Sequence, residues 1–75
     1  MKELVELLAK ALVDQPEAVQ VTQKETEKEV LLELRVAPED MGKVIGKQGK
    51  IAKAIRTMVK AAAAKDGRRV TVEII

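Results

Sequence analysis

Two glycines interrupt the part of this chain that most strongly favours a helix, the stretch VIGKQGKIAKAIR at residues 44–56. A glycine inside a helix costs about 1 kcal/mol relative to alanine, so Gly46 and Gly49 are destabilising unless the chain turns there. A glycine is also the ordinary C-terminal cap of a helix, and a second one can simply begin the next helix. The stretch therefore predicts two helices joined by a tight turn, whether or not the turn has a further role.

The N-terminal half predicts one helix and two strands. Apolar residues recur at steps of three and four over residues 2–13, which indicates a helix whose apolar side holds Leu4, Leu7, Leu8, Ala11 and Leu12. Pro16 ends this helix, because the residue before a proline is pushed out of helical geometry. The alternation that follows predicts a short strand at Val19 and Val21, a polar turn at residues 24–28 and a strand over residues 30–36.

The C-terminal half predicts two helices and a strand. Pro38 suits the first turn of a short helix that carries Met41, Val44 and Ile45. The pattern is helical again from Gly49 to about Lys65, with an apolar side made of Ile51, Ile55, Met58, Val59 and Ala62. Asp66-Gly67 is a turn signal, and residues 70–74 alternate as a final strand.

Together these elements predict a small α+β domain in the order α-β-β-α-α-β. Such an order places three helices on one face of a three-stranded sheet. Leu31, Glu33 and Arg35 would then point outward from the sheet into solvent. The 75 residues are expected to form a single domain, residues 1–75. A domain of this size buries only about 60% of its unfolded surface, so association with a partner would stabilise it.

The charges are distributed unevenly along the chain. Residues 1–40 carry 5 basic and 10 acidic side chains, whereas residues 41–65 carry 7 basic side chains and no acid. Such asymmetry favours a surface that binds a polyanion. The plainer interpretation of a charge run is a solvated helix face, and the charges alone do not decide between the two.

Several function classes are excluded or disfavoured by what the chain lacks. It contains no Cys, His or Ser, which removes disulfides, the commonest zinc ligands and the usual nucleophiles. The spacing from Gly42 to Gly46-Lys47-Gln48 does not match a Walker motif, which needs four residues between its glycines and a Ser or Thr after the lysine. No run approaches the 18 or so apolar residues of a membrane span. We therefore expect neither an enzyme nor a membrane protein, no metal or nucleotide cofactor, and a cytoplasmic location.

The glycine turn has the features of an anion-binding site. The start of a helix offers unpaired backbone N–H groups and a partial positive charge. Glycines on both sides remove side chains that would hold a phosphate-sugar backbone away. Lys47 and Gln48 lie between them, and Lys43 and Lys50 flank them.

These residues carry a resemblance to a known family. The segment I-G-K-Q-G within VIGKQGKIAKAI resembles the signature of the KH domain, whose GXXG loop clamps the backbone of about four nucleotides of single-stranded nucleic acid. The element order resembles the type II version of that fold, with a β-α-α-β core over about residues 29–75. The chain as a whole is similar to the small bacterial RNA-binding proteins of the KhpA type.

The resemblance implies roles for particular residues. Gly46 and Gly49 would let the nucleic-acid backbone approach, while Lys47 and Gln48 would face its phosphates. Ile45 and Ile51 would form an aliphatic groove for bases, with core packing as the alternative for both. For Arg56, the alternative to a phosphate contact is a helix face that points away from the groove. The further phosphate neighbours would be Lys43, Lys50 and Lys53.

The implied function is a single-stranded RNA-binding protein or RNA chaperone, in post-transcriptional regulation linked to cell elongation or division. The chain has no Phe, Tyr or Trp, which excludes aromatic base stacking and predicts weak binding by one copy. The implied partners are single-stranded RNA, or single-stranded DNA, together with a second copy in a homodimer and a larger Jag-type KH protein. The alternative is a protein-interaction module with little RNA binding. Met58, with Ala54 and Ala61 to Ala64, would form either a dimer interface or more of the core, and we expect core.

Overall fold

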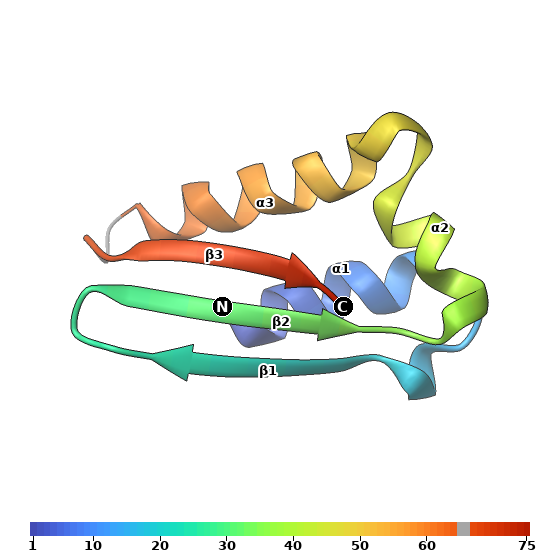
Figure 1. Cartoon of the computed structure of the whole chain (residues 1–75), viewed down its shortest axis with the longest axis horizontal. Helices are drawn as coiled ribbons and strands as arrows, with labels where there is room; N and C mark the ends of the chain where they lie inside the picture. The colour runs from blue at the N-terminus through green and yellow to red at the C-terminus, as the bar shows by residue number, and fades with distance from the viewer. Residues whose placement is uncertain (65–66) are drawn as a thin grey trace.

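Three strands form one sheet in the order β1-β2-β3 in the computed structural model, which describes residues 1–64 and 67–75 (Figure 1). β1 (Gln20–Glu25) pairs antiparallel with β2 (Glu29–Arg35) through a short hairpin. β3 (Arg69–Ile74) pairs parallel with β2, which requires a crossover through the helices between them. The central strand β2 therefore has a neighbour on each side.

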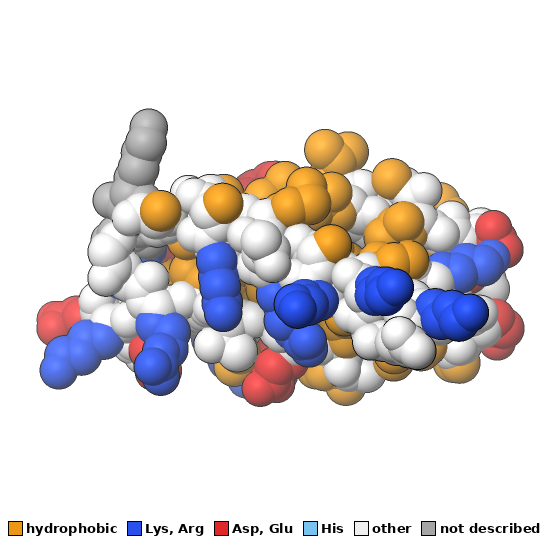
Figure 2. Space-filling model, turned by 90° about the horizontal axis from the view of Figure 1, so that it is seen from above, with side chains coloured by type: hydrophobic (Ala, Val, Ile, Leu, Met, Phe, Trp, Pro, Cys, Tyr) orange, Lys and Arg blue, Asp and Glu red, His pale blue; other side chains and the backbone are white. Residues whose placement is uncertain are grey.

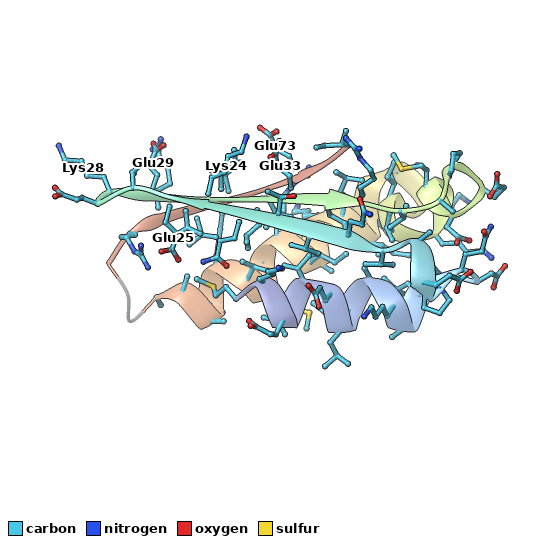
Figure 3. The ribbon with its side chains drawn as sticks, turned by 90° about the horizontal axis from the view of Figure 1, so that it is seen from below. Lys24, Glu25, Lys28, Glu29, Glu33 and Glu73 are labelled. Carbon is cyan, nitrogen blue, oxygen red and sulfur yellow. The ribbon has the colours of Figure 1, made fainter. Side chains whose placement is uncertain are left out.

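Three α-helices cover one face of this sheet. They are α1 (Lys2–Leu12), α2 (Met41–Ile45) and α3 (Lys50–Ala63), and short 3₁₀ turns occupy Pro16–Ala18, Pro38–Asp40 and Lys47–Gly49. Figure 3 shows the sheet nearly edge-on, with the helices on one side of it. The predicted α+β class and the order α-β-β-α-α-β are thus confirmed. Within residues 1–64 and 67–75, no helix is both long and apolar enough to cross a bilayer.

The core lies between the sheet and the helices. Val30, Leu32 and Leu34 alternate along β2 and are almost completely buried, each contributing about 2 kcal/mol through the apolar surface removed from water. They belong to one hydrophobic cluster with Val5 of α1 and Val59 of α3. The alternate apolar side chains of β2 therefore pack against the apolar faces of α1 and α3 in a single core layer.

The opposite face of the sheet is polar and has balanced charge. Lys24, Glu29, Glu33 and Glu73 point away from the helices (Figure 3). Glu33 and Glu73 are directly opposite in the β2–β3 register, a like-charge pair that Lys24 relieves with its Nζ 3.3 Å from Glu33 Oε1. As predicted, Arg35 is exposed, whereas Leu31 and Glu33 are half-buried by their neighbours.

The boundaries differ from the prediction in several places. α1 ends at Leu12 rather than residue 13. The predicted turn at residues 24–28 is too long, because Lys24 and Glu25 still pair with β2. The Thr26 hydroxyl accepts backbone hydrogen bonds from Lys28 and Glu29 and closes the shorter turn. α3 ends at Ala63, and the expected continuation to Lys65 and the turn at Asp66 lie outside the described residues.

The apolar sides of two helices were predicted only in part: Ile55 and Val59 of α3 are buried and Leu4 and Leu8 of α1 pack against the core, but other positions differ. Leu7 is 67% exposed and Met58 is 46% exposed, so the expected core position of Met58 is wrong. The buried positions of α1 are Val5 and Ala9, and α3 buries Ala52 and Ala63 beside Ile55 and Val59. Small residues, Ala9, Ala52 and Ala63, are thus among the buried positions, where they let a helix approach the sheet closely. Larger apolar side chains are left at the margin.

One buried carboxylate connects the end of α1 to the start of α2. Asp40 is 1% exposed, and its two oxygens accept the backbone N–H groups of Asp14 (3.3 Å) and Gln15 (3.0 Å). Lys43 lies 3.6 Å from the same carboxylate. A buried charge is tolerated when it is paired and hydrogen-bonded in this way. Asp40 therefore holds α2, and the glycine turn after it, against the end of α1.

We predict that Asp40→Ala lowers the free energy of unfolding by about 2–4 kcal/mol, because two backbone N–H groups lose a charged acceptor. Urea denaturation followed by circular dichroism would measure this loss. The matched control is Glu39→Ala, which removes an exposed carboxylate that accepts a side-chain bond from Gln15. It should cost less than about 1 kcal/mol. Equal losses in the two variants would show that Asp40 is not a special anchor.

Candidate nucleic-acid interface

Gly46 ends α2 in a conformation that only glycine adopts readily. Its φ is 76° and its ψ is 173°, and its N–H donates to the Gly42 carbonyl over 2.9 Å. A Cβ built on Gly46 would lie 2.5 Å from Cγ1 of Ile51. Both the backbone and the packing therefore require glycine here, and the turn direction depends on it.

Gly49 has a different role, although it also has a positive φ. It lies in the left-handed region (φ 74°, ψ 13°), its N–H donates to the Gly46 carbonyl over 3.2 Å, and it is the N-cap of α3. A Cβ at Gly49 would meet no atom within 4 Å. The missing side chain thus leaves open space beside the start of α3, where a bound backbone could approach. Among residues 1–64 and 67–75, no side-chain group caps this helix start either.

The two residues between the glycines are displayed to solvent. Lys47 and Gln48 are both exposed, and Gln48 has a φ of 59°, which is unusual for a residue with a side chain. Such backbone outliers concentrate at functional sites because the surrounding structure must hold them. The turn therefore presents one cation and one amide next to the open space at Gly49.

Basic side chains continue from the turn along α3. Lys50, Lys53, Arg56 and Lys60 are exposed on this helix. Figure 2 shows basic side chains in a row across the face seen from above, with hydrophobic side chains gathered along one side of the row. The fold thus arranges the basic side chains of residues 47–60 as a linear cationic surface that begins at the glycine turn.

Lys43 differs from the other predicted phosphate neighbours. Its ammonium group forms a hydrogen-bonded ion pair with Asp14 and lies 3.6 Å from Asp40. The hydrogen bond to Asp14 raises the pKa of Lys43 above its ordinary value. Although residues 41–65 contain no acid, the fold brings two acids from elsewhere to this lysine. Its charge is therefore partly compensated within the domain.

The two isoleucines beside the turn are not equivalent. Ile45 is 37% exposed and can offer aliphatic surface to a ligand. Ile51 is half-buried, packs against the core cluster and fills the space beside Gly46. The groove role implied for Ile51 stays a prediction, and its structural role in the turn is the clearer of the two.

A groove between α3 and β3 extends the basic surface. Arg56 and Lys60 line it from the helix, and Gly67 to Val72 line it from the strand side. Arg56 faces this groove, where its Nε donates to the Val72 carbonyl over 3.2 Å. β3 is an edge strand, so its outer backbone groups face this groove. This groove was not predicted from the sequence, although the Arg68-Arg69 pair at the start of β3 was a signal for it.

A helix–GXXG–helix turn with this geometry, set on a sheet with one parallel and one antiparallel neighbour, defines a type II KH domain. The chain belongs to the KhpA/KhpB KH-domain family, whose model matches residues 2–74. It is 67% identical to the RNA-binding protein KhpA of Clostridium perfringens over 75 residues, which are the full length of both chains. The RNA-binding protein KhpA of Aquifex aeolicus is 55% identical over the whole chain and 95% of that relative.

Solved structures share the fold at low sequence identity. The structure of Aquifex aeolicus Era bound to GDP.AlF4- matches 97% of this chain with a TM-score of 0.69 and 22% identity. Era in complex with MgGDPNP and nucleotides 1506-1542 of 16S ribosomal RNA matches 97% with a TM-score of 0.63 and 23% identity. The chain spans 28% of the length of each of those structures.

The different surroundings of the two glycines predict different effects of alanine. Gly46→Ala should lower the free energy of unfolding by about 3 kcal/mol or more, because it adds strain and a clash with Ile51. Gly49→Ala should cost only about 1–2 kcal/mol, since its Cβ meets open space and only the positive φ is strained. Urea denaturation of both variants would measure the difference. Equal destabilisation would contradict the distinct roles assigned to the two positions.

Proposed function

We propose that this protein binds single-stranded RNA by clamping its sugar-phosphate backbone at residues 46–49. The observation that carries the proposal is the open space at Gly49, beside exposed Lys47 and Gln48 at an uncapped helix start. Backbone N–H groups and cations are the donors that phosphates accept from. The names of the KhpA relatives support RNA as the ligand.

The linear cationic surface along α3 provides a path for the backbone of the bound strand. Phosphates would pass Lys47 and then Lys50 and Lys53, while the unstacked bases would turn toward Ile45 and the groove between α3 and β3. The groove is lined by aliphatic and basic groups. Because the chain has no aromatic residue, binding lacks the roughly 1–3 kcal/mol that each base stacked on an aromatic ring contributes. A single copy should therefore bind weakly. Single-stranded DNA would satisfy the same phosphate contacts, and comparison of the two polymers would reveal any use of the 2′-hydroxyl.

In this proposal the protein is a binding protein rather than an enzyme. Residues 1–75 would act as one KH domain in the cytoplasm, as an RNA chaperone in post-transcriptional regulation linked to cell elongation or division. The family membership supports the RNA-related role, and the cellular process follows only from the resemblance. Neither a metal nor a nucleotide cofactor is part of the proposed binding mode.

A second copy would compensate for weak binding, and the exposed edge of α3 favours one. Met58 is 46% exposed there, and Ala54, Ala61 and Ala62 on the same helix are exposed as well. We infer a homodimer through this edge, which would join two RNA sites and raise their joint affinity. A larger Jag-type KH protein is the other partner that this edge could accept.

The central prediction concerns the two residues between the glycines. We expect the Lys47→Asp/Gln48→Asp double variant to lose binding to a fluorescent random-sequence single-stranded RNA pool, since two carboxylates would repel the phosphates. Wild-type binding should weaken with salt at a log–log slope of about −2 to −3, which corresponds to three or four phosphate contacts. Fluorescence anisotropy at several salt concentrations would measure both.

The matched control is Lys2→Asp/Gln20→Asp, which makes the same two changes at exposed positions of α1 and β1. It should keep most of the RNA binding, and circular dichroism should show that all three proteins fold. Equal binding by both double variants would mean that the basic surface is nonspecific and that residues 46–49 are not the clamp. No binding by any of the proteins would favour the protein-interaction alternative.

For the dimer we predict that Met58→Glu shifts the monomer–dimer equilibrium toward monomer by about tenfold or more, because a charge would be buried at the contact. Sedimentation equilibrium over a range of concentrations would measure the shift. Leu7→Glu on α1, which replaces another exposed apolar residue, is the control and should leave the equilibrium unchanged. A Met58→Glu protein that dimerises like the wild type would exclude this edge as the interface.

A further inference from the structure

Lys43 is held by acids at the base of the glycine turn. It lies on α2, three residues before Gly46, so its Cα is within one helical turn of the proposed clamp. Its ammonium group donates to Asp14, which follows the end of α1, and lies 3.6 Å from Oδ1 of Asp40. The lysine is therefore close to the loop, while its charge is engaged within the domain.

The two acids around Lys43 are in contrasting environments. The side chain of Asp40 is only 2% exposed and is fixed by the backbone N–H groups of Asp14 and Gln15. The side chain of Asp14 is 78% exposed, and water can solvate its carboxylate whenever the lysine leaves. Asp40 is thus a structural partner of Lys43, whereas the contact with Asp14 can be exchanged for another anion.

We propose that Asp14 competes with the RNA backbone for Lys43, so that a phosphate must displace the Asp14 carboxylate before Lys43 can contribute to binding. This inference rests on the proposed function, because it assumes that RNA is bound at residues 46–49. A carboxylate and a phosphate oxygen accept the same ammonium donor, and only one of them can take the position next to it. The competition weakens binding and shortens the lifetime of the complex.

Asp14→Asn is the sharpest test, because it removes the charge while keeping the shape and the backbone N–H that bonds to Asp40. We expect it to bind the single-stranded RNA pool about two- to fivefold more tightly than the wild type, the scale of an exposed ion pair. The log–log salt slope should steepen by about 0.7, since one more phosphate contact is free to form. Thermal denaturation should show little change in stability.

Three further variants separate competition from a general charge effect. Glu17→Gln removes an equal charge from an exposed residue of the same connecting segment and should bind like the wild type. Asp14→Asn combined with Lys43→Met should bind no better than Lys43→Met alone, because the gain requires the lysine. Nitrogen-detected NMR of the lysine ammonium groups should show a lower pKa for Lys43 in Asp14→Asn than in the wild type.

The outcomes distinguish this inference from the proposed function. Unchanged RNA affinity in Asp14→Asn, with the wild type binding and Lys47→Asp/Gln48→Asp not binding, would overturn the competition and leave the clamp intact. An equal gain in Glu17→Gln, or a gain that survives Lys43→Met, would also overturn it. If neither the wild type nor Asp14→Asn binds any RNA, the proposed function fails and the competition fails with it.

Discussion

The contact between Gly46 and Ile51 is the constraint on which the candidate site depends. Ile51 occupies the space that a Cβ at residue 46 would need, and it also packs against the core. α2 can therefore end, turn and pass into α3 only with a glycine at this position and an apolar side chain five residues later. The same turn pushes Lys47 and Gln48 outward and leaves Gly49 with open space. Core packing and ligand access are thus linked through one side chain.

Charge is arranged around this turn by the fold rather than by local sequence alone. The basic run becomes a row along α3, while the open face of the sheet balances Glu33 and Glu73 with Lys24. Acids from the N-terminal half reach this basic surface at Lys43, which contacts Asp14 and Asp40, and at Arg68 of the groove, which lies 3.7 Å from Glu25. In this proposal the affinity for RNA depends on the attraction of phosphates to the basic side chains of α3 and on the competition of Asp14 for Lys43.

Much of the fold could be predicted because its elements have clear periodicities. The alternation of β2, the helical pattern of α3 and the break at the two glycines were sufficient for class and element order. The helix faces were harder, since small residues such as Ala9 and Ala63 face the sheet while Leu7 and Met58 remain exposed. Hydrophobicity alone cannot reveal that preference, which depends on how closely a helix approaches the sheet.

The site was predictable where it is local and unpredictable where it depends on tertiary contacts. The turn and its two central residues follow from the motif and its spacing. The hydrogen-bond partner of Lys43, Asp14, lies 29 residues away, and the groove partner of Arg56, Val72, lies 16 residues away. No local pattern carries such pairings. The distinct environments of Gly46 and Gly49 likewise depend on tertiary packing, because Ile51 lies against only one of the two.

The most direct test of the central claim is an NMR titration of the ¹⁵N-labelled protein with a short single-stranded RNA. If RNA binds at the glycine turn, the largest amide shifts will fall on Gly46 to Lys53 and on the β3 residues that line the groove. Amides of Thr22 and Glu33, on the open face of the sheet, should remain nearly unchanged. Shifts centred on that open face, or spread evenly over the domain, would contradict binding at the glycine turn.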